Sequence, residues 1–181
     1  MSEIPQSAHP VLRVRLGKLH DAAMLAELAA RLFQQTFGPM NDPADMRTYV
    51  ASAFSPAAQG EELADPERVV WIAEDHDGVP IGYAMLRRGG TAPGVDGART
   101  AEIQRIYVDR TWHGRGVGEA LMRACLDQSR EWRCDVIWLG VWERNPRAIA
   151  FYEKTGFRAV GRQTFLLGRD VQYDLVMAQP L

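Results

Sequence analysis

The 181-residue chain has little cysteine, no long apolar run and almost no excess of charge of either sign. Its two cysteines are too few for a disulfide framework, and they and the four histidines lack the spacing of a zinc site. No apolar run approaches the length of a membrane-spanning helix, and the N-terminus has no signal-peptide core. The formal net charge of −2 gives no reason to expect nucleic acid as a partner. We therefore expect a cytoplasmic protein without a metal, membrane or nucleic-acid partner.

The chain instead has the composition of one globular domain. Hydrophobic residues make up 46% of it and charged residues 24%, which is ordinary for a folded protein. Residues 1–10 are polar and contain two prolines, so they are expected to form a flexible tail. We predict a single domain over residues 11–178, which is long enough to bury a substantial core.

Hydrophobic periodicity predicts that strands and helices alternate along this domain. Helical patterns follow the capping residues Asp21, Asp42 and Asn145, and another follows Gly118. A connector at 55–66 has room for one short helix. Strands are expected at 11–16, 69–73, 81–86, 101–108, 136–142, 157–167 and 171–177. This order predicts an α/β fold, a mixed sheet with helices on both faces and an antiparallel C-terminal hairpin.

The stretch from Ala101 to Gly118 joins a strand, a glycine-rich turn and the start of a helix. Glycines at 114, 116 and 118 leave the backbone uncovered, so consecutive N–H groups and the helix N-terminus can face one anion. A Walker loop would require Gly-Lys-Ser/Thr here, and a dinucleotide fingerprint would require glycine in place of Leu121. The turn therefore predicts another kind of phosphate cradle, and a glycine-rich turn without a ligand is the alternative.

The turn resembles the Q/R-x-x-G-x-G/A signature of the GCN5-related N-acetyltransferase (GNAT) superfamily, with His113 where that family usually has Gln or Arg. A second segment extends the resemblance, because the family pattern Asn-x-x-Ala-x-x-Phe-Tyr-x-x-x-Gly-Phe follows the next strand. Its places are filled here by Asn145, Ala148, Phe151, Tyr152, Gly156 and Phe157. The resemblance covers 11–177. It implies the GNAT fold with a central sheet of six to seven strands, N-acetyltransferase activity, and acetyl-CoA as cosubstrate without a metal.

Three further segments look like the PaiA-type branch, the bacterial spermidine/spermine acetyltransferases. They are Thr-Phe-Gly-x-x-Asn-Asp-Pro at 36–43, Ile-Trp-Leu-Gly-Val-Trp-Glu at 137–143, and a hairpin at 165–174. The resemblance implies a small primary amine or polyamine as acceptor. A protein amine, N-terminal or lysine, is one alternative, and a non-catalytic coenzyme A-binding regulatory module is another. The sequence leaves open whether the chain forms a homodimer.

The resemblance also implies two catalytic residues. Glu102 lies eleven residues before His113, the spacing at which histone acetyltransferases of this superfamily place their general-base glutamate. An exposed strand glutamate is the alternative for Glu102. Tyr152 would protonate the coenzyme A thiolate, and a core tyrosine is the alternative. No cysteine or serine stands out as a nucleophile, so we expect direct attack in a ternary complex.

Acetyl-CoA is expected to lie along the strand and the cradle. The backbone of Ile106, Tyr107 and Val108 would pair with pantetheine, and the Val108 N–H would bind the thioester oxygen. His113 is expected to be an exposed loop residue, with a pH-sensitive phosphate contact as the alternative. Arg110, Arg115 and Arg147 are candidates for the 3′-phosphate or solvated surface charges. The remaining positions of the expected coenzyme site are Gly114, Gly116, Val117, Gly118, Glu119, Asn145, Ala148 and Tyr152.

Overall fold

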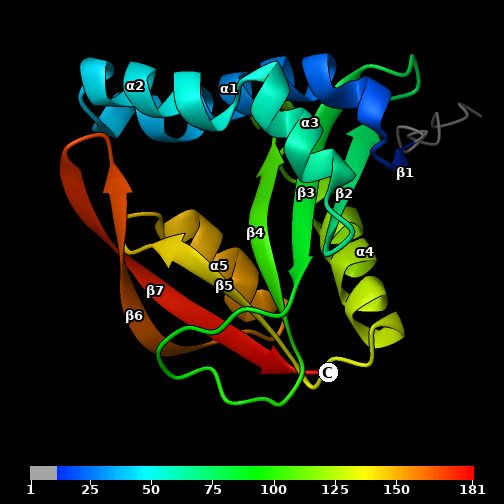
Figure 1. Ribbon diagram of the computed structural model, residues 1–181, viewed down its shortest axis with the longest axis vertical. Helices are drawn as coiled ribbons and strands as arrows, with labels where there is room; N and C mark the ends of the chain where they lie inside the picture. Colours follow the sequence, from blue (N-terminus) through cyan, green and yellow to red (C-terminus); the bar gives the residue numbers. More distant parts are fainter. Residues whose placement is uncertain (1–11) are drawn as a thin grey trace, which may run out of the picture.

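The computed structural model describes residues 12–181, which fold around a mixed sheet (Figure 1). The expected tail, residues 1–10, lies outside this range. The strands follow the spatial order β1-β2-β3-β4-β5-β7-β6, and only β4 and β5 run parallel to each other. Their bounds are β1 Arg13–Leu16, β2 Arg68–Glu74, β3 Pro80–Arg88, β4 Thr100–Val108, β5 Val136–Trp142, β6 Arg158–Leu167 and β7 Asp170–Pro180. The predicted mixed sheet and its C-terminal hairpin are confirmed, with seven strands.

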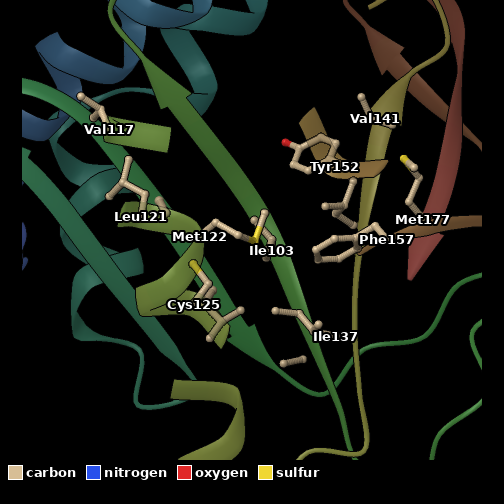
Figure 2. Close-up of a cluster of buried hydrophobic side chains, with 14 of the residues drawn as sticks. Ile103, Val117, Leu121, Met122, Cys125, Ile137, Val141, Tyr152, Phe157 and Met177 are labelled. Atoms are coloured by element: carbon tan, nitrogen blue, oxygen red, sulfur yellow. The ribbon is translucent and has the colours of Figure 1, made fainter. Parts of the chain in front are cut away.

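Helices cover both faces of the sheet, as the sequence predicts. Tyr83 and Met85 of β3 pack with the N-terminal helices, whereas Ala84 and Leu86 pack with the later ones. This follows because successive strand side chains point to opposite faces. One face carries α1 Ala22–Phe37, α2 Pro43–Ala53 and α3 Pro56–Ala64, and the other carries α4 Val117–Glu131 and α5 Pro146–Lys154. Figure 2 shows the core between the sheet and α4, where Leu121 and Cys125 lie in one cluster with Ile103. Within the described residues, no helix combines the length and apolarity needed to cross a bilayer.

Two of the predicted caps form as expected. Asp42 accepts hydrogen bonds from two backbone N–H groups in the first turn of α2, where Pro43 is the first helical residue. The Asn145 side chain accepts from the Ala148 N–H at 3.1 Å and starts α5 in the same way. Gly156, just past α5, has a φ of 102°, a conformation that glycine adopts without steric cost.

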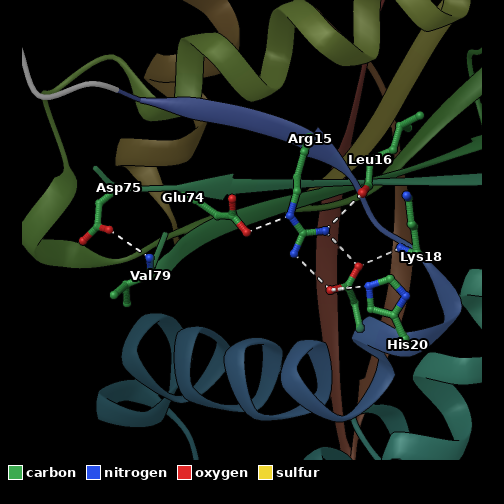
Figure 3. A network of polar contacts seen from close by, with 8 residues as sticks. Arg15, Leu16, Lys18, His20, Glu74, Asp75 and Val79 are labelled. Atoms are coloured by element: carbon green, nitrogen blue, oxygen red, sulfur yellow. Dashed lines mark hydrogen bonds and ion pairs between the residues drawn. The ribbon is translucent and has the colours of Figure 1, made fainter. Parts of the chain in front are cut away.

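Asp21 has a different role from the predicted one. Its side chain makes no capping hydrogen bond to α1; it accepts from the Lys18 N–H at 2.8 Å and from the Arg15 guanidinium at 2.9 and 3.0 Å. Arg15 also donates to Glu74 at 2.7 Å (Figure 3). The hydrogen bonds from Arg15 lower the pKa of Asp21. The carboxylate therefore ties β1 to the start of α1 by a tertiary contact that the local pattern did not reveal.

The sheet opens between its two parallel strands. β4 pairs with β5 only from Thr100 to Ile103, whereas β5 continues to Trp142 alongside β7. A register shift in the β3–β4 ladder leaves Gln104 without an opposite residue, which is a β-bulge at the point of separation. A bulge bends its strand and increases the local twist, so the second half of β4 diverges from β5.

Candidate active site

The opening between β4 and β5 leads into a cavity of about 670 Å³. Its walls come from the second half of β4, the turn before α4, α5 and the end of β5, and on the opposite side from α1, α2 and the β6–β7 hairpin. Arg115, Gly116 and Val117 belong to the same turn without lining the cavity. Apart from Arg110, the other predicted site residues do line it: Glu102, Ile106, Tyr107, Val108, His113, Gly114, Gly118, Glu119, Asn145, Arg147, Ala148 and Tyr152.

The edge of β4 presents unpaired peptide groups to this opening. The Asp109 N–H, just past the end of β4, donates to the carbonyl of Ile81 in β3 at 2.8 Å. Because peptide groups alternate in direction along an antiparallel strand, those of Tyr107 also face β3, whereas those of Ile106 and Val108 face the opening. The strand edge thus offers the peptide groups of Ile106 and the N–H of Val108 to an added extended chain, while the Val108 carbonyl is bound by His113 Nε2 at 2.9 Å. The peptide groups of Tyr107 are already used within the sheet.

The glycine-rich turn forms a run of backbone donors. Among the described residues, the N–H groups from Gly114 to Glu119 have no hydrogen-bond acceptor, and the first helical bond of α4 runs from the Ala120 N–H to Gly116. Gly114 and Gly116 have φ values of 76° and 83°, which turn the chain so that successive N–H groups lie together. Uncompensated donors at a helix N-terminus attract an anion.

Basic side chains surround this turn. The guanidinium of Arg115 lies 5.2 Å from the Trp112 ring centroid, and Arg147 lines the cavity. The ammonium of Lys154 is 3.9 Å from the Glu119 carboxylate. Arg110 begins the short 3₁₀ turn Arg110–Trp112 and does not line the cavity. These positions put positive charge around the anion-binding donors.

His113 is not the exposed loop residue that the sequence suggested. Its side chain is partly buried, and its Nε2 lies 2.9 Å from the Val108 carbonyl. Since a carbonyl only accepts, Nε2 carries the proton and donates. Burial lowers the pKa of His113, although the Val108 hydrogen bond opposes this. The ring therefore ties the turn to the end of β4 in its neutral form.

Tyr152 stands in the opening with a free hydroxyl. The residue is 8% exposed and packs against Phe151 and Phe157, with ring centroids 5.4 and 5.9 Å away. In Figure 2 its hydroxyl is directed toward β4. The hydroxyl makes no hydrogen bond within the described residues. Burial raises the pKa of Tyr152 above its ordinary value, so the phenol stays protonated at neutral pH and can donate.

Glu102 lies on the cavity but already has a partner. Its carboxylate is 2.8 Å from the Arg87 guanidinium, and its side chain is 17% exposed, so it is not an exposed strand glutamate. Burial raises the pKa of Glu102, while Arg87 and Arg68 lower it. Glu102 is thus a desolvated carboxylate in a positively charged setting, and its role as the base stays a prediction.

The far wall of the cavity contains residues that the sequence analysis did not select. Asp174 lines the cavity, and burial raises its pKa to about 6. Gly140 lines it as well and is the only exposed position in β5. An inward-facing aspartate in the largely apolar strand β7 is a sequence signal for a functional carboxylate, because a desolvated charge is costly. Aromatic side chains complete this wall: Phe33, Phe37, Tyr49, Tyr107, Trp142 and Phe165.

One group of metal-ligand residue types lies outside the cavity. Ligand atoms of Asp75, His76 and Asp77, in the β2–β3 turn, lie within 4.8 Å of one another. Asp75 already accepts hydrogen bonds from the N–H groups of Asp77 and Val79, the latter drawn in Figure 3. The turn geometry explains this grouping, and the expectation of no metal stays a prediction.

The chain matches known proteins over most of its length. A family model described as "Acetyltransferase (GNAT) family" matches residues 26–157. An uncharacterized N-acetyltransferase of Mycobacterium tuberculosis is 38% identical over 161 residues, which are 89% of this chain and 98% of that protein. The N-alpha-acetyltransferase RimI of the same organism is 34% identical over 141 residues, 78% of this chain and 75% of that protein.

A solved structure shares the fold. The crystal structure of the PaiA N-acetyltransferase from Thermoplasma acidophilum in complex with coenzyme A has a TM-score of 0.75 to this chain. The match covers 94% of this chain and 99% of that one at 17% sequence identity. At this identity the likeness shows the fold alone.

Proposed function

The chain belongs to the acetyltransferase (GNAT) family and is an N-acetyltransferase, and on this premise we propose that it transfers the acetyl group of acetyl-CoA to a small primary amine or polyamine. The amine attacks directly in a ternary complex. One observation carries the proposal: a single cavity, lined by Gly114, Gly118 and Glu119 of the donor run and by the free strand edge, has a wall of aromatic rings and a carboxylate on its other side. These two sides suit an anionic cosubstrate and a cationic acceptor, respectively.

The donors on the chain fit acetyl-CoA. The N–H groups from Gly114 to Glu119 have no protein acceptor, which suits a pyrophosphate, and Arg115 and Arg147 add positive charge nearby. The free peptide groups of Ile106 and the free N–H of Val108 suit the amide groups of pantetheine and the thioester. When bound, acetyl-CoA supplies the activated acyl group.

The residues around the opening then have distinct tasks. The Val108 N–H polarises the acetyl carbonyl and stabilises the negative charge that develops on its oxygen during attack. Tyr152 donates its phenolic proton toward the leaving sulfur. An alkylamine with a pKa near ~10.4 arrives protonated, so a carboxylate must take a proton before the nitrogen can attack. The sequence predicts Glu102 for that step.

Attack without a covalent enzyme intermediate is supported by the state of the cysteines. Cys125 is fully buried, and burial raises its pKa to about 12, so it is a neutral core thiol at physiological pH. Cys134 is also buried, and burial raises its pKa as well. Neither residue lines the large cavity.

The second candidate acceptor is a polypeptide amine. The similarity to an N-alpha-acetyltransferase, at 34% identity, favours it. A polypeptide acceptor would have to thread its backbone past the aromatic rings to reach the opening. A non-catalytic coenzyme A-binding module is no longer needed as an alternative, because the family and its named members are N-acetyltransferases.

Thiol release from acetyl-CoA by the purified protein tests the proposal. The acceptor panel contains spermidine, 1,4-diaminobutane, n-butylamine and a short peptide with a free N-terminus, each at equal concentration. We expect the highest kcat/KM with one of the small amines. Turnover with the peptide alone would instead favour the second candidate, and coenzyme A binding without any turnover would overturn the small-amine proposal.

A further inference from the structure

We propose that Asp174 is the carboxylate that binds the ammonium group of the acceptor and removes its first proton. The inference rests on the proposed function, because it concerns the acceptor side of the same cavity. It extends that function by naming the acceptor class as an alkylammonium ion and by assigning the residue that recognises it.

The sheet places the Asp174 side chain next to Gly140, the glycine of β5. Asp174 lies opposite Trp142 of β5 on one side and Gln163 of β6 on the other. A Cβ atom built on Gly140 would lie 3.1 Å from Asp174 Oδ2 and 2.6 Å from Gln163 Nε2. Both side chains therefore occupy the space that a side chain at position 140 would fill. The missing side chain at Gly140 thus leaves room for the Asp174 carboxylate in the cavity wall, where Gly140, Gln163 and Asp174 all line the cavity.

Asp174 lacks a counter-charge. Within residues 12–181, no lysine, arginine or histidine lies within ion-pair distance of its carboxylate, and it accepts no hydrogen bond from another side chain. Burial alone raises its pKa, to about 6. A desolvated, unpaired carboxylate costs free energy at neutral pH, and a bound cation would recover it.

The groups that face Asp174 do not supply a positive charge. Tyr49 of α2 and Tyr107 of β4 have pKa values raised by burial and further by the Asp174 charge, so both stay neutral. Arg105 of β4 is bound to Glu62 of α3 at 2.7 Å. The neighbouring residue on β6, Arg162, points to the opposite face, because it sits next to Gln163 in the strand. Elsewhere on the cavity, Glu102 is paired with Arg87, and His113 is neutral.

Aromatic rings line the approach to the carboxylate. Phe37 packs against Trp142 with ring centroids 6.0 Å apart, and Tyr49 packs against Phe165 at 5.5 Å. Figure 1 shows the β6–β7 hairpin reaching toward α2. Ring faces attract cations and also accept alkyl chains. The combination with a half-buried carboxylate selects an ammonium group carried on an apolar chain.

Each proton that moves during acetyl transfer has a donor and an acceptor. The acceptor R–NH₃⁺ gives one proton to the Asp174 carboxylate and becomes R–NH₂. Its lone pair then forms the N–C bond to the acetyl carbon as the C–S bond breaks. The second proton leaves the nitrogen as the amide forms and returns through water to Tyr152, which has given its own proton to the sulfur, so the thiol, the amide and the phenol are all neutral. Asp174 afterwards releases its proton to water.

Two features favour Asp174 over Glu102 for this task. The Glu102 carboxylate lies 2.8 Å from the Arg87 guanidinium, and Arg87 and Arg68 both lower the pKa of Glu102. Both cations would also repel an incoming ammonium group. Asp174 has no such neighbour. Glu102 is therefore the competitor in the experiment.

The test compares Asp174→Asn with Glu102→Gln and with Asp127→Asn, a matched charge removal on the solvent face of α4, where Asp127 is 61% exposed. With the best small amine, Asp174→Asn is expected to lower kcat/KM at neutral pH by about 10²-fold or more, with unchanged coenzyme A affinity by calorimetry. Asp127→Asn is expected to match the parent. Equal kcat/KM in Asp174→Asn and the parent overturns the proposal.

The pH profile separates a base from a structural residue. In the parent, kcat/KM should rise as Asp174 loses its proton near pH 6 and fall as the free amine loses its own near ~10.4. In Asp174→Asn only the neutral amine reacts, so kcat/KM should climb steadily toward the amine pKa. If the rise of kcat/KM near pH 6 persists in Asp174→Asn and disappears in Glu102→Gln, the proton acceptor is Glu102.

Binding decides the question if the parent shows no turnover. Spermidine, 1,4-diaminobutane and n-butylamine are titrated by calorimetry into the coenzyme A-loaded parent and the loaded Asp174→Asn variant. We expect at least about tenfold weaker binding in the variant, since a charge-assisted contact is lost. The absence of turnover together with this loss refutes the proposed function and leaves the ammonium site standing. Equal binding by both proteins, or binding by neither, refutes the ammonium site.

Thermal unfolding controls for folding. A native pKa above the ordinary value means that this carboxyl stabilises the fold only while protonated, and the contribution is lost as pH rises to about 6. The Tm of Asp174→Asn should therefore be higher than that of the parent at neutral pH, and the two Tm values should be equal at acidic pH. A variant that melts below the parent at neutral pH would contradict the unpaired, desolvated carboxylate on which the inference rests.

Discussion

Replacing Tyr152 with phenylalanine removes one oxygen atom from the opening between β4 and β5. The hydroxyl has no hydrogen-bond partner within the described residues, so its loss leaves no buried group unsatisfied. The ring keeps its packing against Phe151 and Phe157. We expect the free energy of unfolding to change by less than ~0.5 kcal/mol. For a chain of this length, that is a shift of about 2 °C or less in Tm.

The effect on turnover should be much larger. A positioned acid contributes about 10²–10⁴-fold, and water in the open cavity can replace part of that contribution. We therefore expect kcat to fall at least tenfold in Tyr152→Phe, which corresponds to ~1.4 kcal/mol of activation free energy. Acetyl-CoA affinity should stay near the parent value, because the hydroxyl acts after binding.

Steady-state thiol release, with calorimetry for affinity, measures these quantities. Tyr173→Phe is the matched control, since Tyr173 is 51% exposed and lies outside the cavity. If Tyr152→Phe turns over like the parent from about pH 6 to about pH 9, the acid role is wrong. A loss of affinity with kcat preserved would make the hydroxyl a binding contact.

Further predictions concern the cradle, its histidine and the cysteines. Gly118→Ala adds a Cβ 3.4 Å from the Phe151 ring at a helical position, so the fold should persist while coenzyme A affinity falls at least about tenfold. The control Gly38→Ala, where a Cβ meets nothing within 4 Å, should bind coenzyme A like the parent. Equal coenzyme A affinities in the two variants would argue against the cradle. His113→Gln keeps a donor for the Val108 carbonyl, which accepts from His113 at 2.9 Å, so its Tm should stay near that of the parent. His113→Ala should lose about 1 kcal/mol of unfolding free energy in chemical denaturation. Identical denaturation curves for His113→Ala and the parent would show that this hydrogen bond contributes nothing. Cys125→Ala should keep kcat within about twofold, because a neutral buried thiol is not a nucleophile, and loss of transfer in a folded variant would point to covalent catalysis.

The sequence determined the features that depend on neighbouring residues. Asn145 with Pro146 sets the start of α5 through hydrogen bonds within one helical turn. The glycines around Gly116 leave backbone donors free because of their own conformations. The near-continuous apolar run Val136–Trp142 predicts a strand covered on both faces, and β5 has these bounds. Local steric and hydrogen-bonding preferences are written in a few consecutive residues, so a single sequence reveals them.

Side-chain partners far apart along the chain required the tertiary structure. His113 was misjudged because its partner is a backbone carbonyl, which no residue type reveals. Glu102 meets Arg87 only because the β3–β4 register brings them opposite each other. Asp21 met Arg15 across a turn instead of capping α1, since a charged side chain takes the strongest partner within reach.

The position of Asp174 in the cavity wall was decided by the strand order. The chain makes β6 before β7, yet β7 inserts between β5 and β6 in the sheet. That insertion sets Asp174 beside Gly140, 34 positions earlier in the sequence. Strand order follows from the burial of whole faces and from loop closure over long separations, and these energies belong to no local window of sequence. The sequence thus predicted the glycine-rich turn whose backbone donors the structure leaves free, and only the folded sheet brought Asp174 to the wall of the same cavity.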